Sequence, residues 1–487
     1  MTSSQQMPNV RTAFATVRSP NGYLSLATAV LLAATALMPQ LWRTLNSVAA
    51  ELAAVGTLVT LLLVWLMKPH HIGRHRADQR HGTVIAARSI LQLVLHLWPV
   101  GILTLIYPIA SQRMAGTAVG GVRLTSLLLA VALTVPWLSQ GVCMPLYRAI
   151  GPLIHDGDMD KIRSEFCEVW PLTFAQSLPT ILLFAIPVQL ATQWSMKAMS
   201  AYVGLCVLDL AFAQSLVLTN MGHHRFGWAL AWTGYAAPLL VFPTAWFLPP
   251  LLGLVPHLVL LHRFLRVRLI ALDRIDVLRD VVRGLLLGSV LWADKLFYFL
   301  RDANHFAVET VFLALLPAVL AYNYYFVRLA PGFDSSVASL RAAMENEPIS
   351  SLGRYSQELF ALVQTSIVRT ALAGALLSFG ISWTMINITP DRAGLIAGVA
   401  TASWLFMMTT VLCYKIDYIG EHRVSQGFSG AHLALCGVAF VAMPAGPALY
   451  FALAGIELLL FFVALRACLT SWRMPEYTFF WRHATAW

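Results

Sequence analysis

The sequence has few charged residues and lacks the common catalytic and metal-binding motifs. Charged residues make up 11% of the 487-residue chain, whereas soluble domains carry about 25%. The six cysteines are scattered, with no C-x-x-C pair. There is no P-loop, H-E-x-x-H or G-x-S-x-G motif. A soluble fold of this size is therefore excluded, and we expect no catalytic residue, no cofactor, no metal site and no enzymatic activity.

The chain instead contains long apolar runs. Hydrophobic residues make up 58% of it. Only helices and closed barrels satisfy their backbone groups in hydrocarbon, and the runs at 61–67 and 458–465 are continuous rather than alternating, which favours helices. We expect an all-α integral membrane protein with about 14 transmembrane helices, and at least about 12, since a span needs roughly 20 apolar residues.

The apolar runs place the spans along the chain. They are predicted near residues 22–41, 47–67, 89–110, 117–138, 170–190, 199–219, 227–247, 248–262, 284–300, 306–327, 361–387, 393–414, 430–446 and 447–465.

The distribution of Lys and Arg predicts the orientation. With the N-terminus inside, 26 of the 33 basic residues fall on the cytoplasmic side, six fall outside and Lys295 lies within a span. Cytoplasmic loops carry such an excess. We therefore expect a multi-pass protein of the cytoplasmic (inner) membrane with both termini in the cytoplasm. This distribution explains the net charge of +10 without a nucleic-acid partner.

The longer connections repeat. Basic segments at 68–88 and 263–283 each precede two spans, a mixed-charge connection at 144–168 or 328–359 follows, and four more spans complete each set. Repeated halves around a midplane cavity are typical of alternating-access transporters. We expect two six-helix lobes around a central cavity, plus two extra N-terminal helices.

This repeat divides the chain into six parts. They are a cytoplasmic N-terminus at 1–21, two extra N-terminal spans and a basic cytoplasmic loop at 22–88, a first lobe at 89–262, a basic amphipathic inter-lobe helix at 263–283, a second lobe at 284–465, and a cytoplasmic aromatic and basic tail at 466–487.

Two adjacent ionisable residues, Asp294 and Lys295, lie inside the ninth predicted span, close to Trp292. Ionisable residues within a span are costly and suggest a functional site. Neighbouring side chains point about 100° apart on a helix, so we expect Asp294 and Lys295 not to pair with each other. The structural alternative is that Asp294 joins two helices while Lys295 reaches the outer interface.

Three further acids, Asp209, Glu309 and Glu457, are candidates for a polar transport pathway. Asp209 and Glu457 lie deep in the sixth and fourteenth predicted spans, whereas Glu309 lies near an outer end. A hydrogen bond between helices is the alternative role for the two deep acids.

The segment 263–283 carries apolar residues at helical spacing beside Arg263, Arg266, Arg274 and Arg279. This pattern predicts an amphipathic helix on the inner membrane surface, where the arginines contact lipid headgroups. The same helix could dock a cytoplasmic partner such as a glycan synthase, and the sequence leaves both interpretations open.

The stretch 284–299, GLLLGSVLWADKLFYF, resembles the start of the second half of PelG-type exopolysaccharide exporters. The similarity continues through 315–318 and 322–341. Those exporters belong to the multidrug, oligosaccharide-lipid and polysaccharide transporter superfamily. The resemblance implies that a polysaccharide or lipid-linked glycan crosses the membrane beside a synthase, with Trp292, Asp294 and Lys295 as site residues. The chain departs from the family pattern in its two extra N-terminal spans and in lacking an acidic residue at 323–326.

Two other classes of protein stay open. One is a membrane scaffold that holds a glycan synthase through its basic inner helices. The other is an intramembrane acyltransferase or polymerase that modifies a glycan, but such an enzyme usually needs a sizeable outer loop, and the predicted outer loops are very short.

Overall fold

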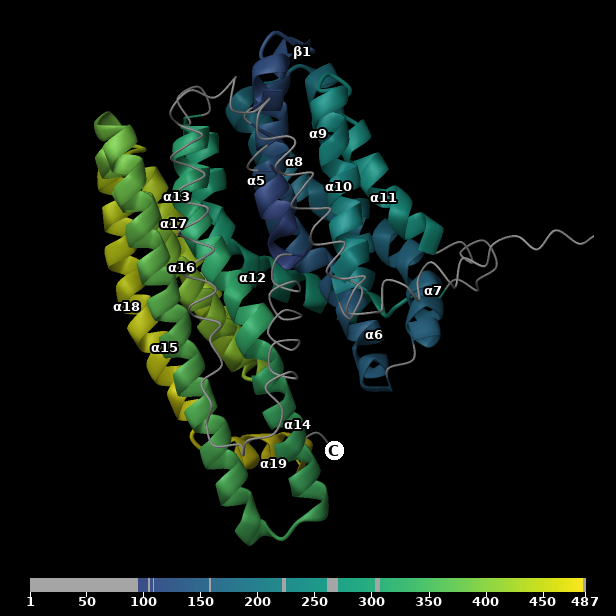
Figure 1. Cartoon of the computed structure of the whole chain (residues 1–487), viewed down its shortest axis with the longest axis vertical. Coiled ribbons are helices and arrows are strands. Elements are labelled where there is room, and N and C mark those ends of the chain that lie inside the picture. Colours follow the sequence, from purple (N-terminus) through teal and green to yellow (C-terminus); the bar gives the residue numbers. More distant parts are fainter. Residues whose placement is uncertain are drawn as a thin grey trace, which may run out of the picture. The chain divides into compact units, whose positions relative to one another are not determined.

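The computed structural model describes residues 95–484, apart from gaps at 104–105, 108, 157–158, 221–224, 261–269 and 303–306. The described part is almost entirely helical (Figure 1), which confirms the all-α prediction. The two extra N-terminal spans, the basic loop after them and the residues Arg263 and Arg266 lie outside the described residues.

The first half begins with helical residues at 95–103, 106–107 and 109–114. A short antiparallel hairpin of β1 (Ala118–Val119) and β2 (Val122–Arg123) follows. The remaining elements are α5 (Leu124–Val142), α6 (Met144–Asp156), α7 (Met159–Ser177), the 3-10 turn η1 (Leu178–Ile181), α8 (Leu182–Thr192), α9 (Met196–Asn220), α10 (Arg225–Val241) and α11 (Leu248–Leu260). Helix α9 packs against α5, α7, α10 and α11 and forms the centre of this half.

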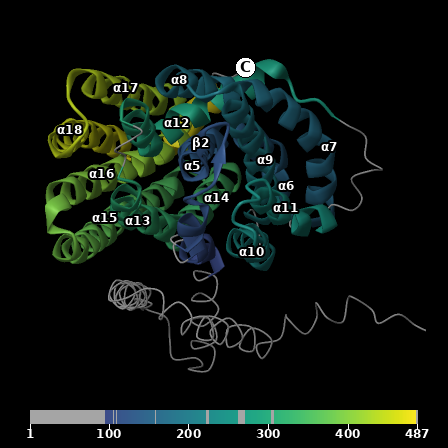
Figure 2. The same ribbon diagram turned by 90° about the horizontal axis from the view of Figure 1, so that it is seen from above.

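The second half repeats this order. Its elements are α12 (Arg274–Arg301), α13 (Val308–Tyr324), the π-helical turn η3 (Tyr325–Leu329), α14 (Ala330–Asn346), α15 (Ile349–Ile388), the 3-10 turn η4 (Pro390–Arg392), α16 (Ala393–Tyr418), α17 (His422–Ala442) and α18 (Pro447–Ser471). Helix α16 takes the place that α9 has in the first half and packs against α12, α13, α15, α17 and α18. Figure 2 shows the two halves side by side.

Most of these helices are able to cross a membrane. Eight helical segments in the described residues are long and apolar enough, and two shorter apolar helices lie at Phe226–Val241 and Leu248–Leu258. They fall within the predicted spans or overlap them. One predicted span is misplaced at its start: residue 117 precedes the hairpin, because Gly120 and Gly121 both adopt positive φ and turn the chain before α5 begins at Leu124.

The first helix of each half contacts the second helix of the other half. The first helix of the second half, α12, packs against the second full helix of the first half, α5. In return, His96 near the start of the first half lies 2.8 Å from Asn323 Oδ1 on α13. Corresponding helices thus exchange partners, as expected for two related lobes.

The crossing of α5 and α12 depends on glycine. A Cβ atom on Gly284 would lie 2.2 Å from the Gln140 carbonyl oxygen, and one on Gly141 would lie 2.8 Å from the Val281 carbonyl oxygen. The two backbones can approach this closely because neither glycine carries a side chain. At the same crossing, Trp137 Nε1 donates to the Leu285 carbonyl oxygen at 2.8 Å.

The predicted amphipathic inter-lobe helix is wrong in its described part. Residues 274–283 are the first turns of α12, which runs without a break to Arg301. Asp273 starts this helix because its side chain accepts hydrogen bonds from the Ile275 and Asp276 amides, at 2.9 and 3.1 Å. Arg274 and Arg279 therefore lie on the same helix as the ninth predicted span, although α12 is not among the eight segments counted above.

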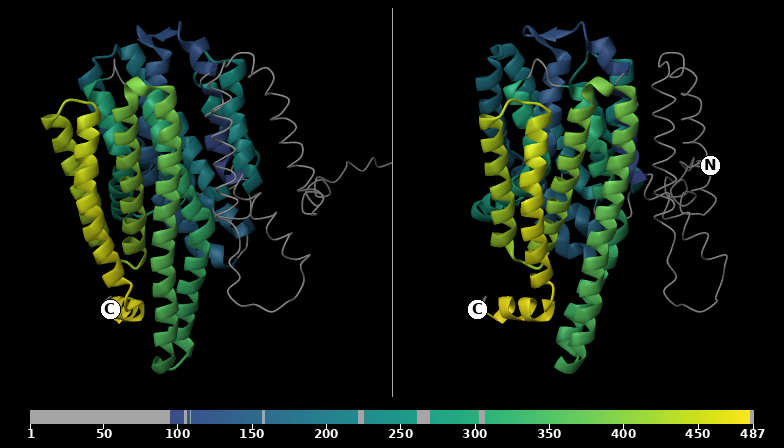
Figure 3. Two further views of the ribbon diagram at one scale, coloured as in Figure 1. Left: turned by 60° about the vertical axis from the view of Figure 1, so that its left-hand side comes forward. Right: turned by 90° about the vertical axis from the view of Figure 1, so that its left-hand side faces the viewer.

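The mixed-charge connections are helical too. Helix α14 and the first turns of α15 form a hairpin at the predicted cytoplasmic end, and the tail helix α19 (Pro475–Ala484) lies across that end (Figure 3). Ser356 on α15 donates a hydrogen bond to Glu476 on α19, and Arg341 on α14 lies 5.0 Å from the centre of the Phe479 ring. The tail is thereby packed against the second half.

Candidate functional site

The buried charges of the second half begin with Asp294 and Lys295 on α12, whose side chains are both 0% exposed. Lys295 Nζ lies 2.9 Å from Asp294 Oδ1, so the expectation that they do not pair is wrong. The ammonium group also donates to the Leu291 carbonyl and Ser403 Oγ, each at 3.1 Å. The directions of the Cα–Cβ bonds differ, but the four methylene groups of lysine let Nζ fold back toward its neighbour.

A second buried pair joins α17 to α18. His432 Nδ1 lies 2.7 Å from Glu457 Oε2, and both side chains are 2% exposed. Phe406 on α16 connects the two pairs: its ring centre is 5.2 Å from Lys295 Nζ and 4.9 Å from the His432 ring, which it meets edge to face. Phe406 therefore contacts one member of each pair inside the second half.

These residues, Asp294, Lys295, Phe406, His432 and Glu457, form what we call the four-helix cluster, since they come from α12, α16, α17 and α18. Tyr450 and Cys436 are electrostatic neighbours of Asp294. Tyr450 extends the cluster along α18, and Cys436 is also close to Glu457.

The four-helix cluster contains polar atoms without a hydrogen bond. Within the described residues, Glu457 Oε1 and His432 Nε2 are buried and have no hydrogen bond. Buried polar atoms are normally satisfied, and exceptions point to strain, an ion or a functional role. The cluster contains two carboxyl groups, Asp294 and Glu457, and one ammonium group, Lys295, besides the His432 ring.

Of the residues predicted from the sequence, the structure brings Asp294, Lys295 and Glu457 together. Trp292 lies one turn away on α12 and is partly buried. Asp209 is buried on α9 in the first half, next to Tyr235, and Glu309 is exposed in the first turn of α13. Neither of these two acids belongs to the four-helix cluster.

The predicted membrane-surface residues lie on the first turns of α12. Arg274 is exposed, and Arg279 is 68% exposed and pairs with Asp276 at 3.3 Å. Both side chains are free to contact lipid headgroups or a partner, and these roles stay predictions.

His432 was missed from the sequence, although a signal was present. Helices α17 and α18 are joined by a short turn between Ala442 and Pro447. His432 precedes the centre of that turn by as many residues as Glu457 follows it. In an antiparallel helical hairpin, two positions equally far from the turn lie at the same depth. The pairing of His432 with Glu457 could therefore have been predicted from their equal distance in residues from the turn.

Lys415 on α16 was also missed. It is 0% exposed, and its Nζ has no hydrogen bond within the described residues. The ammonium lies 4.1 Å from the Phe333 ring centre and 5.0 Å from that of Tyr325. Aromatic faces attract cations, and Asp334 on α14 is an electrostatic neighbour of the same ammonium. The predicted span ended at 414, so Lys415 was assigned to a loop.

A chain of ion pairs crosses between the halves at the predicted cytoplasmic end. Arg148 on α6 contacts Asp276 at 3.1 Å and Asp280 at 2.9 Å, both on α12. Further along α12, Arg283 pairs with Asp417 on α16, and Asp417 Oδ1 lies 2.8 Å from His422 Nδ1. Helix α12 is therefore held by charge to both halves.

Comparisons with known proteins do not assign the chain to a family. No protein-family model and no curated protein matches the chain. Among solved structures, the chain is similar to the crystal structure of a MATE mutant, with a TM-score of 0.41 and 10% identity over 85% of this chain and 99% of that chain. The likeness is too low to assign a function.

Proposed function

We propose that the chain is a membrane transporter that exports or flips a polysaccharide or lipid-linked glycan by alternating access, and that it does so without catalysing a reaction. The observation that carries this proposal is the four-helix cluster, which buries two acids, a lysine and a histidine between α12 and three helices that are long and apolar enough to cross a membrane. Charges in such positions are costly and are typical of ion and substrate pathways.

The junction of the halves supports alternating access. The glycines of the α5–α12 crossing let two backbones touch, which suits a pivot, and Arg148 joins the halves through pairs in which its own side chain is 42% exposed. An exposed ion pair contributes only about 0–1 kcal/mol. It can therefore open and re-form during rocking of the two lobes at little cost.

The cluster also suggests how export is driven. Its two carboxyl groups outnumber its one ammonium group, so the cluster is suited to bind a proton or a sodium ion. Binding of that ion changes the charge on α12, which also forms the junction. Exchange of the ion across the membrane would then bias the junction between its two arrangements.

The glycan substrate is supported by the resemblance of 284–299 to PelG-type exporters. That resemblance also suggests a glycan synthase as partner, bound to the cytoplasmic face of the inner membrane. The exposed arginines at the start of α12 and the α14–α15 hairpin both lie at the predicted cytoplasmic end, where such a partner would dock.

The test is to delete the gene, complement it with the wild type, and measure cell-surface and intracellular carbohydrate separately. We expect the deletion to lose surface glycan while glycan or its lipid-linked precursor accumulates inside. Normal surface glycan in the deletion strain would contradict the proposal. Loss of surface glycan with no intracellular material would favour the scaffold, since a scaffold is needed for synthesis rather than for export.

A further inference from the structure

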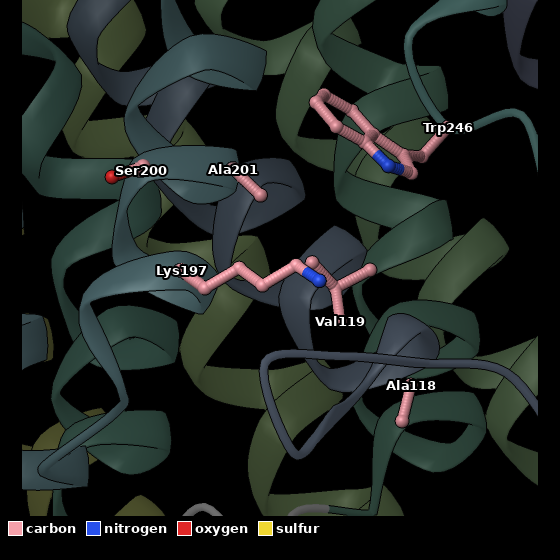
Figure 4. A pocket seen from close by; sticks show the side chains of 6 residues that line it. All are labelled: Ala118, Val119, Lys197, Ser200, Ala201 and Trp246. Carbon is pink, nitrogen blue, oxygen red and sulfur yellow. The ribbon is translucent and has the colours of Figure 1, made fainter.

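A pocket of about 500 Å³ lies at the predicted outer end of the first half, away from the four-helix cluster. It is lined by Ala118, Val119, Lys197, Ser200, Ala201 and Trp246. These come from the β1–β2 hairpin, the first turns of α9 and the segment between α10 and α11. Three connections far apart in the sequence thus meet at one opening, where Figure 4 shows Lys197 and Trp246 facing the same space.

Direct contacts fix the walls of this pocket. Ser195 Oγ donates to the Gly120 carbonyl at 2.6 Å and lies 3.3 Å from the Ala198 amide, whose hydrogen bond it accepts. Gly120 has φ +59°, and a Cβ there would lie 2.4 Å from Ser195 Oγ. Glycine is therefore required for the hairpin to lie against α9. Arg113 Nη1 holds the end of α10 by donating to the Leu240 carbonyl at 2.8 Å.

The charge around the pocket is of one sign. The segments 109–123, 190–200 and 240–250 contain Arg113, Arg123 and Lys197 and no Asp or Glu. Lys197 is exposed, and within the described residues it has no ion pair. At the corresponding end of the second half, Arg301 and Arg392 have acidic neighbours in the sequence, Asp302 and Asp391. The pocket of the first half therefore attracts anions, which the second half does not.

The pocket walls combine three kinds of group. The Trp246 indole offers an apolar face, against which the C–H face of a sugar ring can pack. Ser200 offers a hydroxyl that can donate to or accept from sugar hydroxyls, and Lys197 offers a mobile ammonium group for a carboxylate.

We propose that this pocket binds an acidic sugar unit, such as a uronate, on the outer face of the membrane. The proposal rests on the proposed function, in which a glycan emerges on that side, and it deepens that function by assigning a carboxylate-bearing saccharide as the ligand class. The ammonium of Lys197 binds the carboxylate, Trp246 packs against the ring, and the growing chain is held at the exit.

The test uses the full-length protein in nanodiscs and measures binding of an oligogalacturonate and of a neutral oligosaccharide of equal length by calorimetry. Three proteins are compared: the wild type, Lys197→Gln, and Arg301→Gln, which removes an exposed outer base of the second half. Because Lys197 is exposed, its ion pair with the ligand is weakened by solvent. We therefore expect Lys197→Gln to weaken oligogalacturonate binding about two- to fivefold.

We expect Arg301→Gln to bind like the wild type and the neutral oligosaccharide to bind more weakly than the acidic one. Equal losses in the two variants would show diffuse charge attraction and overturn the site. Equal binding of both oligosaccharides by the wild type would overturn the acidic specificity. The binding experiment and the gene-deletion experiment test different claims. If deletion leaves surface glycan normal but Lys197-dependent binding is observed, the export proposal fails and the pocket remains. If deletion abolishes export but binding does not depend on Lys197, the pocket proposal fails and export remains.

Discussion

The two halves of the chain have the same order of helices but bury different kinds of polar groups. In the first half, the buried polar side chains of the central helix α9 are neutral apart from Asp209. Gln214 accepts from Trp170 Nε1 and donates to the Val142 carbonyl, each at 3.0 Å. His257 lies between Ser215 and Thr219, at 2.8 and 3.2 Å. In the second half, the central helix α16 contacts buried Lys295 and carries buried Lys415 and Asp417.

This difference suggests a division of roles. A satisfied neutral network fixes one packing arrangement, and it has no net charge that an ion could change. The charged groups of the second half respond to a proton or cation. Asp209, beside Tyr235, is the one buried acid among the described membrane-crossing residues of the first half. It provides a control for the comparison.

The largest effect is expected from breaking the charged pair. Lys295→Met leaves the buried Asp294 carboxylate without its cation, and loss of one partner of a buried pair costs about 3–5 kcal/mol. We expect the free energy of unfolding, measured by SDS titration in mixed micelles, to fall by that amount. Adding Asp294→Asn to Lys295→Met should restore part of the loss. A single variant as stable as the wild type would show that the pair contributes nothing to folding.

The next largest effect concerns the junction between the halves. Gly284→Ala places a methyl group against the Gln140 carbonyl, where the ideal position is only 2.2 Å away. Forced overpacking costs about 1–3 kcal/mol, so the variant should unfold at a lower SDS fraction. Gly353→Ala on α15, where a Cβ meets nothing within 4 Å, is the matched control. Equal behaviour of the two would argue against a close crossing.

A smaller effect is expected from the neutral network. His257→Leu removes the ring that Ser215 and Thr219 contact, but each hydroxyl also has a backbone carbonyl within donating distance, of Phe212 at 2.7 Å and of Leu216 at 3.1 Å. We expect a loss of about 1 kcal/mol, at the low end for a buried group that loses a partner. Glycan export should stay unchanged. Loss of export in a stable His257→Leu protein would remove the contrast between the halves.

The smallest effect on stability is expected at Arg148. Arg148→Gln breaks two partly exposed ion pairs, each of which contributes about 0–1 kcal/mol. We expect the loss in unfolding free energy to be below about 1 kcal/mol and to shrink further at high salt, where the Debye length falls. A larger, salt-independent loss would mean that Arg148 fixes the halves together rather than forming a contact that opens.

Hydropathy predicted the helices well because a span of apolar residues has a length fixed by the bilayer. Hydropathy failed where a turn or a helix cap sets the boundary of a helix. Paired glycines turn the chain before α5, and Asp273 starts α12 well before the apolar run begins. The predicted surface helix at 274–283 and the span from 284 are one helix, since the helical hydrogen bonds continue regardless of side-chain polarity.

The site was predicted in part. Asp294, Lys295 and Glu457 were identified because ionisable groups stand out in apolar segments. Their partners His432, Ser403 and Phe406 depend on which helices pack together, and only the His432–Glu457 pair could have been found, from its symmetry about a turn. The pairing of Asp294 with Lys295 was mispredicted because backbone direction was considered and side-chain flexibility was not.

The most direct test of the central claim is glycan export by three variants at matched levels in the membrane: Asp294→Asn and Glu457→Gln in the four-helix cluster, and Asp209→Asn in the first half. Each replaces one buried carboxyl group by an amide of the same shape. We predict that the two cluster variants lose at least about nine-tenths of export, while Asp209→Asn retains most of it, since about 1.4 kcal/mol already corresponds to tenfold. Export that is unchanged in both cluster variants, or lost equally in all three, would contradict the account.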